Sequence, residues 1–174
     1  VSFLTFFLVS LVSFAQADKE PTINWMSFEE AVAANKSESK KFLIDVYTDW
    51  CGWCKRMDRT TFRNPKVVAI VNKYYHAVKL NAERKDTVAL DDRIFINEKP
   101  NAKRHPHQLA VSLMQGKMTY PTVVYLDESG NMLQPIPGFQ STENILPILN
   151  YFGSDAYKTT NWEEYQAKFE LKEQ

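Results

Sequence analysis

The sequence has few cysteines and no excess of charge of either sign. Its 174 residues include two cysteines, 21 basic and 21 acidic side chains, and no run of basic residues. A disulfide framework needs cysteines spread along the chain, so this source of stability is excluded. The lack of a basic cluster likewise argues against nucleic acid as a partner. With 44% hydrophobic residues, the chain can build one packed core without such cross-links.

The amino-terminal segment is apolar and uncharged. Residues 1–15 read VSFLTFFLVSLVSFA, a run shorter than the about 20 residues of a membrane-spanning helix and typical of a signal peptide. Ala15-Gln16-Ala17 places small residues where a signal peptidase cuts. We therefore predict a signal peptide at residues 1–17 and cleavage before Asp18. The mature chain is then exported to the periplasm or the cell exterior, with no stable membrane insertion. An amino-terminal anchor or a core strand is the alternative.

Beyond residue 17 the sequence predicts one domain, residues 18–174, in which strands and helices alternate. Two capping boxes begin helices at Ser27 and Thr160, and Asn64-Pro65 is a cap followed by a first-turn proline. The patterns predict strands at 23–26, 42–47, 76–81, 123–126 and from 132, and helices at 27–34, from 51, and at 66–75, 109–116, 142–152 and 162–169. Residues 35–41 are expected to form a loop. This order is typical of an α/β fold with a mixed central sheet and helices on both faces.

The two cysteines stand three positions apart, in Cys51-Gly52-Trp53-Cys54. A disulfide between them closes almost no loop and adds little stability, so the pair is interpreted as chemical rather than structural. Thiol–disulfide exchange needs an accessible thiolate. Cys51 at a helix start meets free N–H groups and the positive end of the helix dipole, which favour a pKa in the range of about 3.5–7.5. We expect Cys51 to be the exposed attacking thiol and Cys54, one turn later, to be the buried resolving thiol.

A Cys-x-x-Cys pair is also half of a zinc site. His105-Pro106-His107 would complete a set of four ligands if residues 83–106 folded back onto the cysteines. A solvated loop is the favoured interpretation of these histidines, so we expect no metal. We also expect no cofactor beyond a redox-active disulfide between Cys51 and Cys54.

The residues around the cysteine pair resemble the thioredoxin superfamily over nearly the whole mature chain. Four features carry the resemblance: Trp50 before the first cysteine, Asp45 six residues before it, Lys79-Leu80-Asn81 on the next strand, and Tyr120-Pro121-Thr122. Trp-Cys-Gly-Trp-Cys-Lys followed by Thr61-Phe62-Arg63-Asn64-Pro65 is similar to secreted bacterial thioredoxin-like proteins. The resemblance implies a thioredoxin fold with an insertion at about 83–106 before a cis-proline strand. It also implies a helical extension at about 153–174.

The resemblance also implies roles for the residues that match it. Asp45, alone in an apolar strand, should be buried with a raised pKa and should take the proton from Cys54, while Lys79 moderates that pKa. A purely structural hydrogen bond is the alternative for Asp45. A cis bond at Tyr120–Pro121 would expose the backbone of Tyr120 for pairing with a substrate segment. Trp50, Gly52 and Trp53 would form the rim of the substrate site; ordinary core packing is the alternative for both tryptophans and is favoured for Trp50 over Trp53.

Two functions remain open at this point. The first is an enzyme that reduces, oxidises or isomerises protein disulfides, with reduction favoured and a transmembrane thiol carrier as its electron supply. The second is a non-catalytic binding protein whose dithiol is a regulatory or metal-binding latch. Trp53 stands where plain thioredoxins have proline, so their redox potential does not carry over to this chain.

Overall fold

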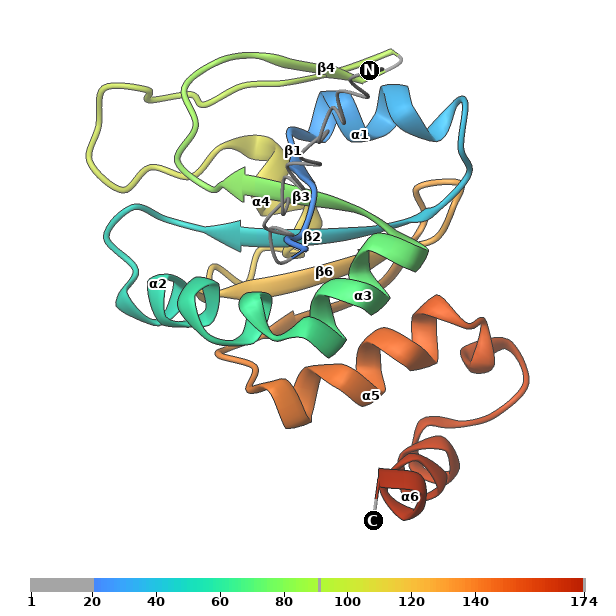
Figure 1. The fold of residues 1–174 in the computed structure, drawn as a ribbon. Helices are drawn as coiled ribbons and strands as arrows, with labels where there is room; N and C mark the ends of the chain where they lie inside the picture. The colour runs from blue at the N-terminus through green and yellow to red at the C-terminus, as the bar shows by residue number, and fades with distance from the viewer. Residues whose placement is uncertain (1–20, 91, 174) are drawn as a thin grey trace, which may run out of the picture.

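The computed structural model describes residues 21–90 and 92–173, with side chains up to residue 171, so the predicted signal peptide lies outside the described residues. Figure 1 shows a central sheet between layers of helices. The elements in chain order are β1 (Trp25–Met26), α1 (Phe28–Asn35), β2 (Lys41–Tyr47), α2 (Gly52–Arg59), η1 (Thr61–Arg63), α3 (Pro65–Tyr74), β3 (Tyr75–Asn81), β4 (Val88–Leu90), β5 (Arg93–Phe95), α4 (Gln108–Leu113), β6 (Thr122–Leu126), β7 (Met132–Pro137), α5 (Thr142–Gly153), η2 (Ala156–Lys158) and α6 (Trp162–Glu173).

The central sheet has five strands in the order β1-β3-β2-β6-β7. β1, β3 and β2 run parallel, whereas β6 and β7 are antiparallel to their neighbours. Strands β4 and β5 form a separate antiparallel pair within the insertion. The predicted mixed sheet is confirmed, and β2 lies at its centre, where its carboxyl end delivers the chain to Cys51.

Alternation along β2 divides the core into two layers. Phe42, Ile44 and Val46 pack with α1 and α4 on one face, and Leu43 packs with α3 and α5 on the other. Figure 1 shows α3 and α5 on one side of the sheet and α1 on the opposite side. Because side chains two apart in a strand share a face, Asp45 lies on the same face as Leu43.

Two of the predicted helix starts are confirmed. Ser27 Oγ accepts a hydrogen bond from Glu30 N, and Glu30 Oε2 accepts one from Ser27 N, which completes the capping box of α1. Asn64 Oδ1 accepts hydrogen bonds from the first turn of α3, whose first residue is Pro65. These local signals are correct because they depend on only a few neighbouring residues.

Three boundary predictions are wrong. Asn161, not Thr160, caps α6: its Oδ1 accepts from Glu164 N at 2.9 Å, because Asn161 directly precedes the first helical residue Trp162 and its side chain reaches the third. This helix continues past residue 169 to Glu173. Lys41, expected in a loop, begins β2 and is buried, because its ammonium group is paired with Glu128 at 2.5 Å and Asp155 at 2.8 Å.

Candidate functional site

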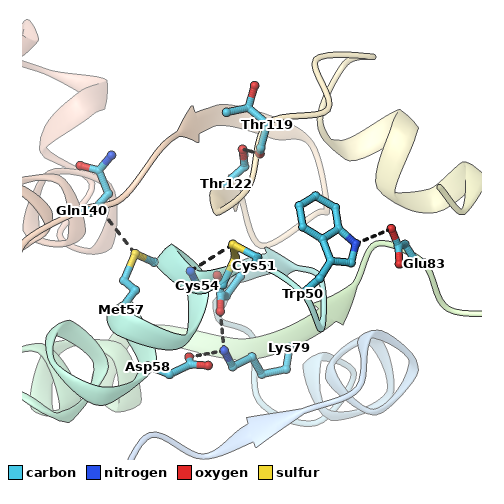
Figure 2. Close-up of a disulfide and its surroundings, with 11 residues drawn as sticks. Trp50, Cys51, Cys54, Met57, Asp58, Lys79, Glu83, Thr119, Thr122 and Gln140 are labelled. Atoms are coloured by element: carbon cyan, nitrogen blue, oxygen red, sulfur yellow. Dashed lines mark hydrogen bonds and ion pairs between the residues drawn. A yellow bond between two sulfur atoms is a disulfide. The ribbon is translucent and has the colours of Figure 1, made fainter. Parts of the chain in front are cut away.

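Cys51 and Cys54 form a disulfide at the start of α2, with the two sulfur atoms 2.04 Å apart. Cys51 is the N-cap of this helix, and its Sγ accepts a hydrogen bond from Cys54 N at 3.1 Å (Figure 2). The first turn of α2 contains no acidic residue that would oppose the helix dipole. A thiolate on Cys51 would therefore meet a favourable N–H group and the positive helix end once the disulfide is reduced.

Both cysteines are buried in the disulfide form. Cys54 is 2% exposed, in agreement with the prediction, but Cys51 is only 5% exposed. The expectation of an exposed Cys51 is therefore wrong for this state. The physical reason is that its sulfur is turned toward the helix, where it bonds Cys54 Sγ and accepts from Cys54 N.

Asp45 is the buried carboxylate beneath the helix. It is 1% exposed, and burial raises its pKa to about 6 even though Lys79 Nζ lies 2.5 Å from its Oδ2 and acts in the opposite direction. Its Oδ1 has no hydrogen-bond partner among the described residues. A carboxyl group with this pKa can hold or release a proton near neutral pH.

Lys79 connects the sheet to the redox helix. It stands directly beside Asp45 in the parallel register of β2 and β3, and its ammonium group also pairs with Asp58 of α2 (Figure 2). Burial lowers the pKa of Lys79, but the two carboxylates outweigh this effect, so that the pKa is raised overall. Because Asp58 is four residues after Cys54, both lie on one face of α2, and Lys79 ties that face to Asp45.

Trp50 and Trp53 flank the disulfide and are both exposed, at 48% and 56%. The alternative of core packing for Trp50 is therefore wrong. Its indole Nε1 donates to Glu83 Oε1 at 2.9 Å, as Figure 2 shows, and its ring makes a T-shaped contact with the Tyr120 ring, with the centroids 5.8 Å apart. The Trp53 ring packs on the Phe139 ring, with the two centroids 5.4 Å apart. The two indoles form an aromatic rim on either side of the cysteine pair.

The segment before β6 has the predicted cis bond between Tyr120 and Pro121. Pro121 is buried, and its carbonyl accepts from Gly138 N at 2.8 Å. Thr122 Oγ1 donates to the Thr119 carbonyl at 2.6 Å, which ties the two sides of the segment together. Within residues 21–90 and 92–173 the backbone N–H and carbonyl of Tyr120 make no hydrogen bond, so both remain available to another chain.

His105, at the end of the insertion, and His107, directly after it, hold the insertion in place. The solvated-loop prediction is wrong for His107, which is fully buried: its Nδ1 accepts from Leu109 N at 3.1 Å and its Nε2 donates to the Asp86 carbonyl at 2.9 Å. Burial lowers the pKa of His107. His105 Nδ1 contacts Asn97 Oδ1 at 3.0 Å. In the part of the chain that the structure describes, no three His, Cys, Asp or Glu side chains gather as a metal ion would require.

Three residues of the site escaped the sequence analysis. Asp58 carried a usable signal, since four-residue spacing from Cys54 places it on the same helix face. Glu83 and Arg104 carried none, because their contacts with Trp50 depend on the path of the insertion.

The family model of the thioredoxin-like domain matches residues 28–153. Thiol:disulfide interchange protein DsbD of Actinobacillus pleuropneumoniae is 28% identical over 116 residues, which cover 66% of this chain and 16% of that protein. Disulfide bond reductase DsbH of Chlamydia pneumoniae is 25% identical over 113 residues, covering 64% of this chain and 60% of that protein. The chain thus spans less than two thirds of the length of these relatives.

Solved structures give the same fold. A thioredoxin-fold protein of Helicobacter pylori superposes with a TM-score of 0.58 at 17% identity, over 87% of this chain and 89% of that chain. A thioredoxin of Thermus thermophilus gives a TM-score of 0.55 at 12% identity, over 75% and 87%. Among the described residues no helix is both long and apolar enough to cross a membrane.

Proposed function

We propose that this chain, which belongs to the thioredoxin-like domain family and is a thiol–disulfide oxidoreductase, reduces disulfides of other proteins through Cys51 and Cys54. The observation that carries the proposal is the position of Cys51 at the cap of α2, where Cys54 N donates to its sulfur. That contact favours the thiolate of Cys51, which is the form that attacks a disulfide. The name of the chlamydial relative, a disulfide bond reductase, supports the reductive direction.

The reaction proceeds in two exchanges. The Cys51 thiolate attacks one sulfur of the client disulfide, which forms a mixed disulfide and releases the other client sulfur as a thiolate. Cys54 then loses its proton and attacks Cys51 Sγ, which frees the second client thiol and leaves the Cys51–Cys54 disulfide. The two electrons of the dithiol have passed to the client. A dithiol donor must restore them, and we propose a transmembrane thiol carrier for this step.

Asp45 is proposed as the base that takes the proton from Cys54. Its burial and its pKa of about 6 suit a group that accepts a proton near neutral pH. Lys79 is proposed to keep the pKa from rising further, because its ammonium group favours the ionised carboxylate. The ion pair of Lys79 with Asp58 supports this role, since it holds Lys79 between the sheet and α2.

The client segment is proposed to lie across the disulfide between the two indoles. Trp50 and Trp53 offer exposed apolar surface on either side, and Gly52 between the cysteines has open space at its Cα. The unpaired backbone of Tyr120, next to Pro121, can pair with an extended client strand. This arrangement supports recognition of a main chain rather than of one particular sequence.

Reduction of insulin disulfides by dithiothreitol, followed by turbidity, tests this proposal. The reduced chain should speed precipitation of the insulin chains, and Cys51→Ser should act no faster than dithiothreitol alone. Lys36→Gln, an exposed position before β2 and therefore at the opposite end of that strand from Cys51, is the matched control that should retain full activity. A wild-type chain that adds nothing to dithiothreitol would refute the reductase proposal.

Export stays a proposal from residues 1–17. Mass spectrometry of the protein from its native host should find Asp18 as the amino terminus. An intact segment before that position would contradict both cleavage and the proposed location in the periplasm or outside the cell.

A further inference from the structure

The insertion returns to the redox site and holds Trp50 from both of its ends. Glu83, at its start, accepts the indole N–H at 2.9 Å, and the guanidinium carbon of Arg104, near its end, lies 4.7 Å from the centre of the indole ring. Arg104 has a left-handed backbone with φ of 57°, a conformation that favours glycine. A long cationic side chain nevertheless occupies this position, directly beside Trp50, the residue that precedes Cys51.

The path of the insertion is fixed by buried and charged contacts. Arg84 pairs with Glu29 of α1 at 2.7 Å and with Asp86 at 2.6 Å, which anchors the first limb to the body of the domain. Asn97 Nδ2 donates to the carbonyls of Arg84 and His105, which joins the first limb to the last. The surface that the insertion presents beside Trp50 is therefore preorganised, so little ordering is required when a partner binds.

That surface is a hollow of about 320 Å³ with an excess of positive charge. Lys85 and the segment 100–104 line it together with Trp50 and Glu83. Lys85 and Lys103 are exposed and make no ion pair with the residues that the structure describes, and Arg104 contacts the indole ring. The acid that lines the hollow, Glu83, already accepts the Trp50 N–H. Three cations thus stand together in a chain whose formal net charge is zero.

We propose that the insertion forms a cationic rim, made by Lys85, Lys103 and Arg104, that binds acidic side chains next to the disulfide of a protein client. The inference rests on the proposed function and names the substrate class of that same site. The rim borders Trp50, which is adjacent to the attacking Cys51, so the acidic residues of the client would lie close to its disulfide in sequence or in space. Exposed charges of opposite sign act mainly on encounter and binding, so the rim should affect KM more than the chemical step.

Two fluorescent peptides with one internal disulfide each test the inference. They differ only in the residues beside the cystine, which are glutamates in one and glutamines in the other. The reduced full-length chain should reduce the disulfide of the glutamate peptide with a kcat/KM about three- to tenfold higher than that for the glutamine peptide at low ionic strength, mostly through a lower KM. This preference should shrink in about 0.5 M salt. Lys85→Gln/Lys103→Gln should reduce the preference, because only Arg104 of the rim then remains, and should leave reduction of the glutamine peptide unchanged.

A control double variant, Lys36→Gln/Lys168→Gln, removes the same amount of charge at exposed positions before β2 and on α6. It should keep the preference for the glutamate peptide. Equal kcat/KM for both peptides in the wild type, or a preference as large in Lys85→Gln/Lys103→Gln as in the wild type, would overturn the rim while the reductase proposal stands. If the chain reduces the disulfide of neither peptide, the reductase proposal is overturned and the rim with it.

Discussion

Cys51 and Cys54 receive different help from the same helix. Cys51 stands before the first turn, where its sulfur accepts from Cys54 N, whereas Cys54 lies within that turn; in the disulfide form both are buried. Burial opposes ionisation of a thiol, and a helix N-terminus favours it. The difference predicts that one cysteine attacks clients and that the other resolves the mixed disulfide.

Alkylation of the reduced native protein with iodoacetamide near neutral pH should therefore modify Cys51 and spare Cys54. Cys54→Ser should trap mixed disulfides with client proteins, because the attack still occurs and the resolution does not. Cys51→Ser should trap few. Peptide mapping by mass spectrometry reads both results. Equal labelling of the two cysteines would show that the helix cap does not distinguish them.

Asp45→Asn should slow turnover by about 10²–10⁴-fold, the usual range for loss of a general base. The attack by Cys51 should continue, because its thiolate depends on the helix start, so mixed disulfides should accumulate under turnover conditions. Asp58→Asn also removes a carboxylate from Lys79 but at an exposed position, and it should slow turnover less than Asp45→Asn, because Asp45 remains to take the proton. Stopped-flow reduction of a client, with gel analysis of trapped species, separates the steps. Normal turnover by Asp45→Asn between about pH 6 and pH 9 would reduce Asp45 to a structural role.

The raised pKa of Asp45 also predicts how stability changes with pH. Its pKa of about 6 in the folded chain exceeds the ordinary value of 3.8, so the folded state binds more protons between these values and loses stability as pH rises through them. Asp45→Asn carries no such penalty. The free energy of unfolding of Asp45→Asn should match that of the wild type at about pH 4 and exceed it by about 2–3 kcal/mol at about pH 8. Urea denaturation at both pH values checks this. A variant less stable than the wild type at the higher pH would contradict the burial penalty.

At the scale of elements, α4 depends on one histidine. His107 caps the amino terminus of α4 through Nδ1, and its Nε2 donates to the Asp86 carbonyl of the insertion. It therefore links α4 to the first part of the insertion, a contact that the sequence did not predict. His107→Ala loses both hydrogen bonds and leaves a cavity, and should lower the free energy of unfolding by about 2–4 kcal/mol. His107→Asn, which keeps a capping oxygen, should lose less.

The lowered pKa of His107 adds a pH signature to the same pair of variants. The folded state disfavours its protonation, so the stability due to this group is present above the ordinary pKa of 6.5 and is lost as pH falls below it. The wild type should therefore lose its advantage over His107→Asn as pH falls toward about 5. Thermal unfolding at several pH values measures the difference. A constant difference across that range would mean that the imidazole is not buried in its neutral form.

Local sequence signals predicted some elements well and others poorly. The capping box at Ser27 and the proline after Asn64 place α1 and α3, because a cap depends on residues within one turn. The pair β4 and β5 was missed, since each strand has only three residues and Val88 packs in a core cluster with residues of α1 and α4, far away in the sequence. Lys41 was assigned to a loop because its buried ion pairs involve Glu128 and Asp155, far away in the sequence.

At the scale of the whole molecule, the mixed sheet and its helical layers follow from the order of strands and helices together with the family resemblance. The cysteine pair was predicted from its spacing, whereas the roles of Asp45, Lys79 and the Tyr120–Pro121 segment were named from that resemblance, and the fold brings Asp45 and Lys79 into contact. The Trp50 environment could not be foreseen, because Glu83 and Arg104 reach it only through the folded insertion. The final helix packs its aromatic side chains on Tyr151 and lies beyond α5 in Figure 1, away from the sheet.

The reduction potential of the Cys51–Cys54 pair tests the central claim most directly. Equilibration of the chain with defined ratios of reduced and oxidised dithiothreitol or glutathione, followed by quantification of the free thiols, gives the value. A protein disulfide reductase should have a potential near that of a reducing thioredoxin, about −270 mV. Since about 30 mV changes the equilibrium constant tenfold, a strongly oxidising pair would differ by about five powers of ten. A potential of about −120 mV would contradict the reductive direction and identify the chain as a donor of disulfides.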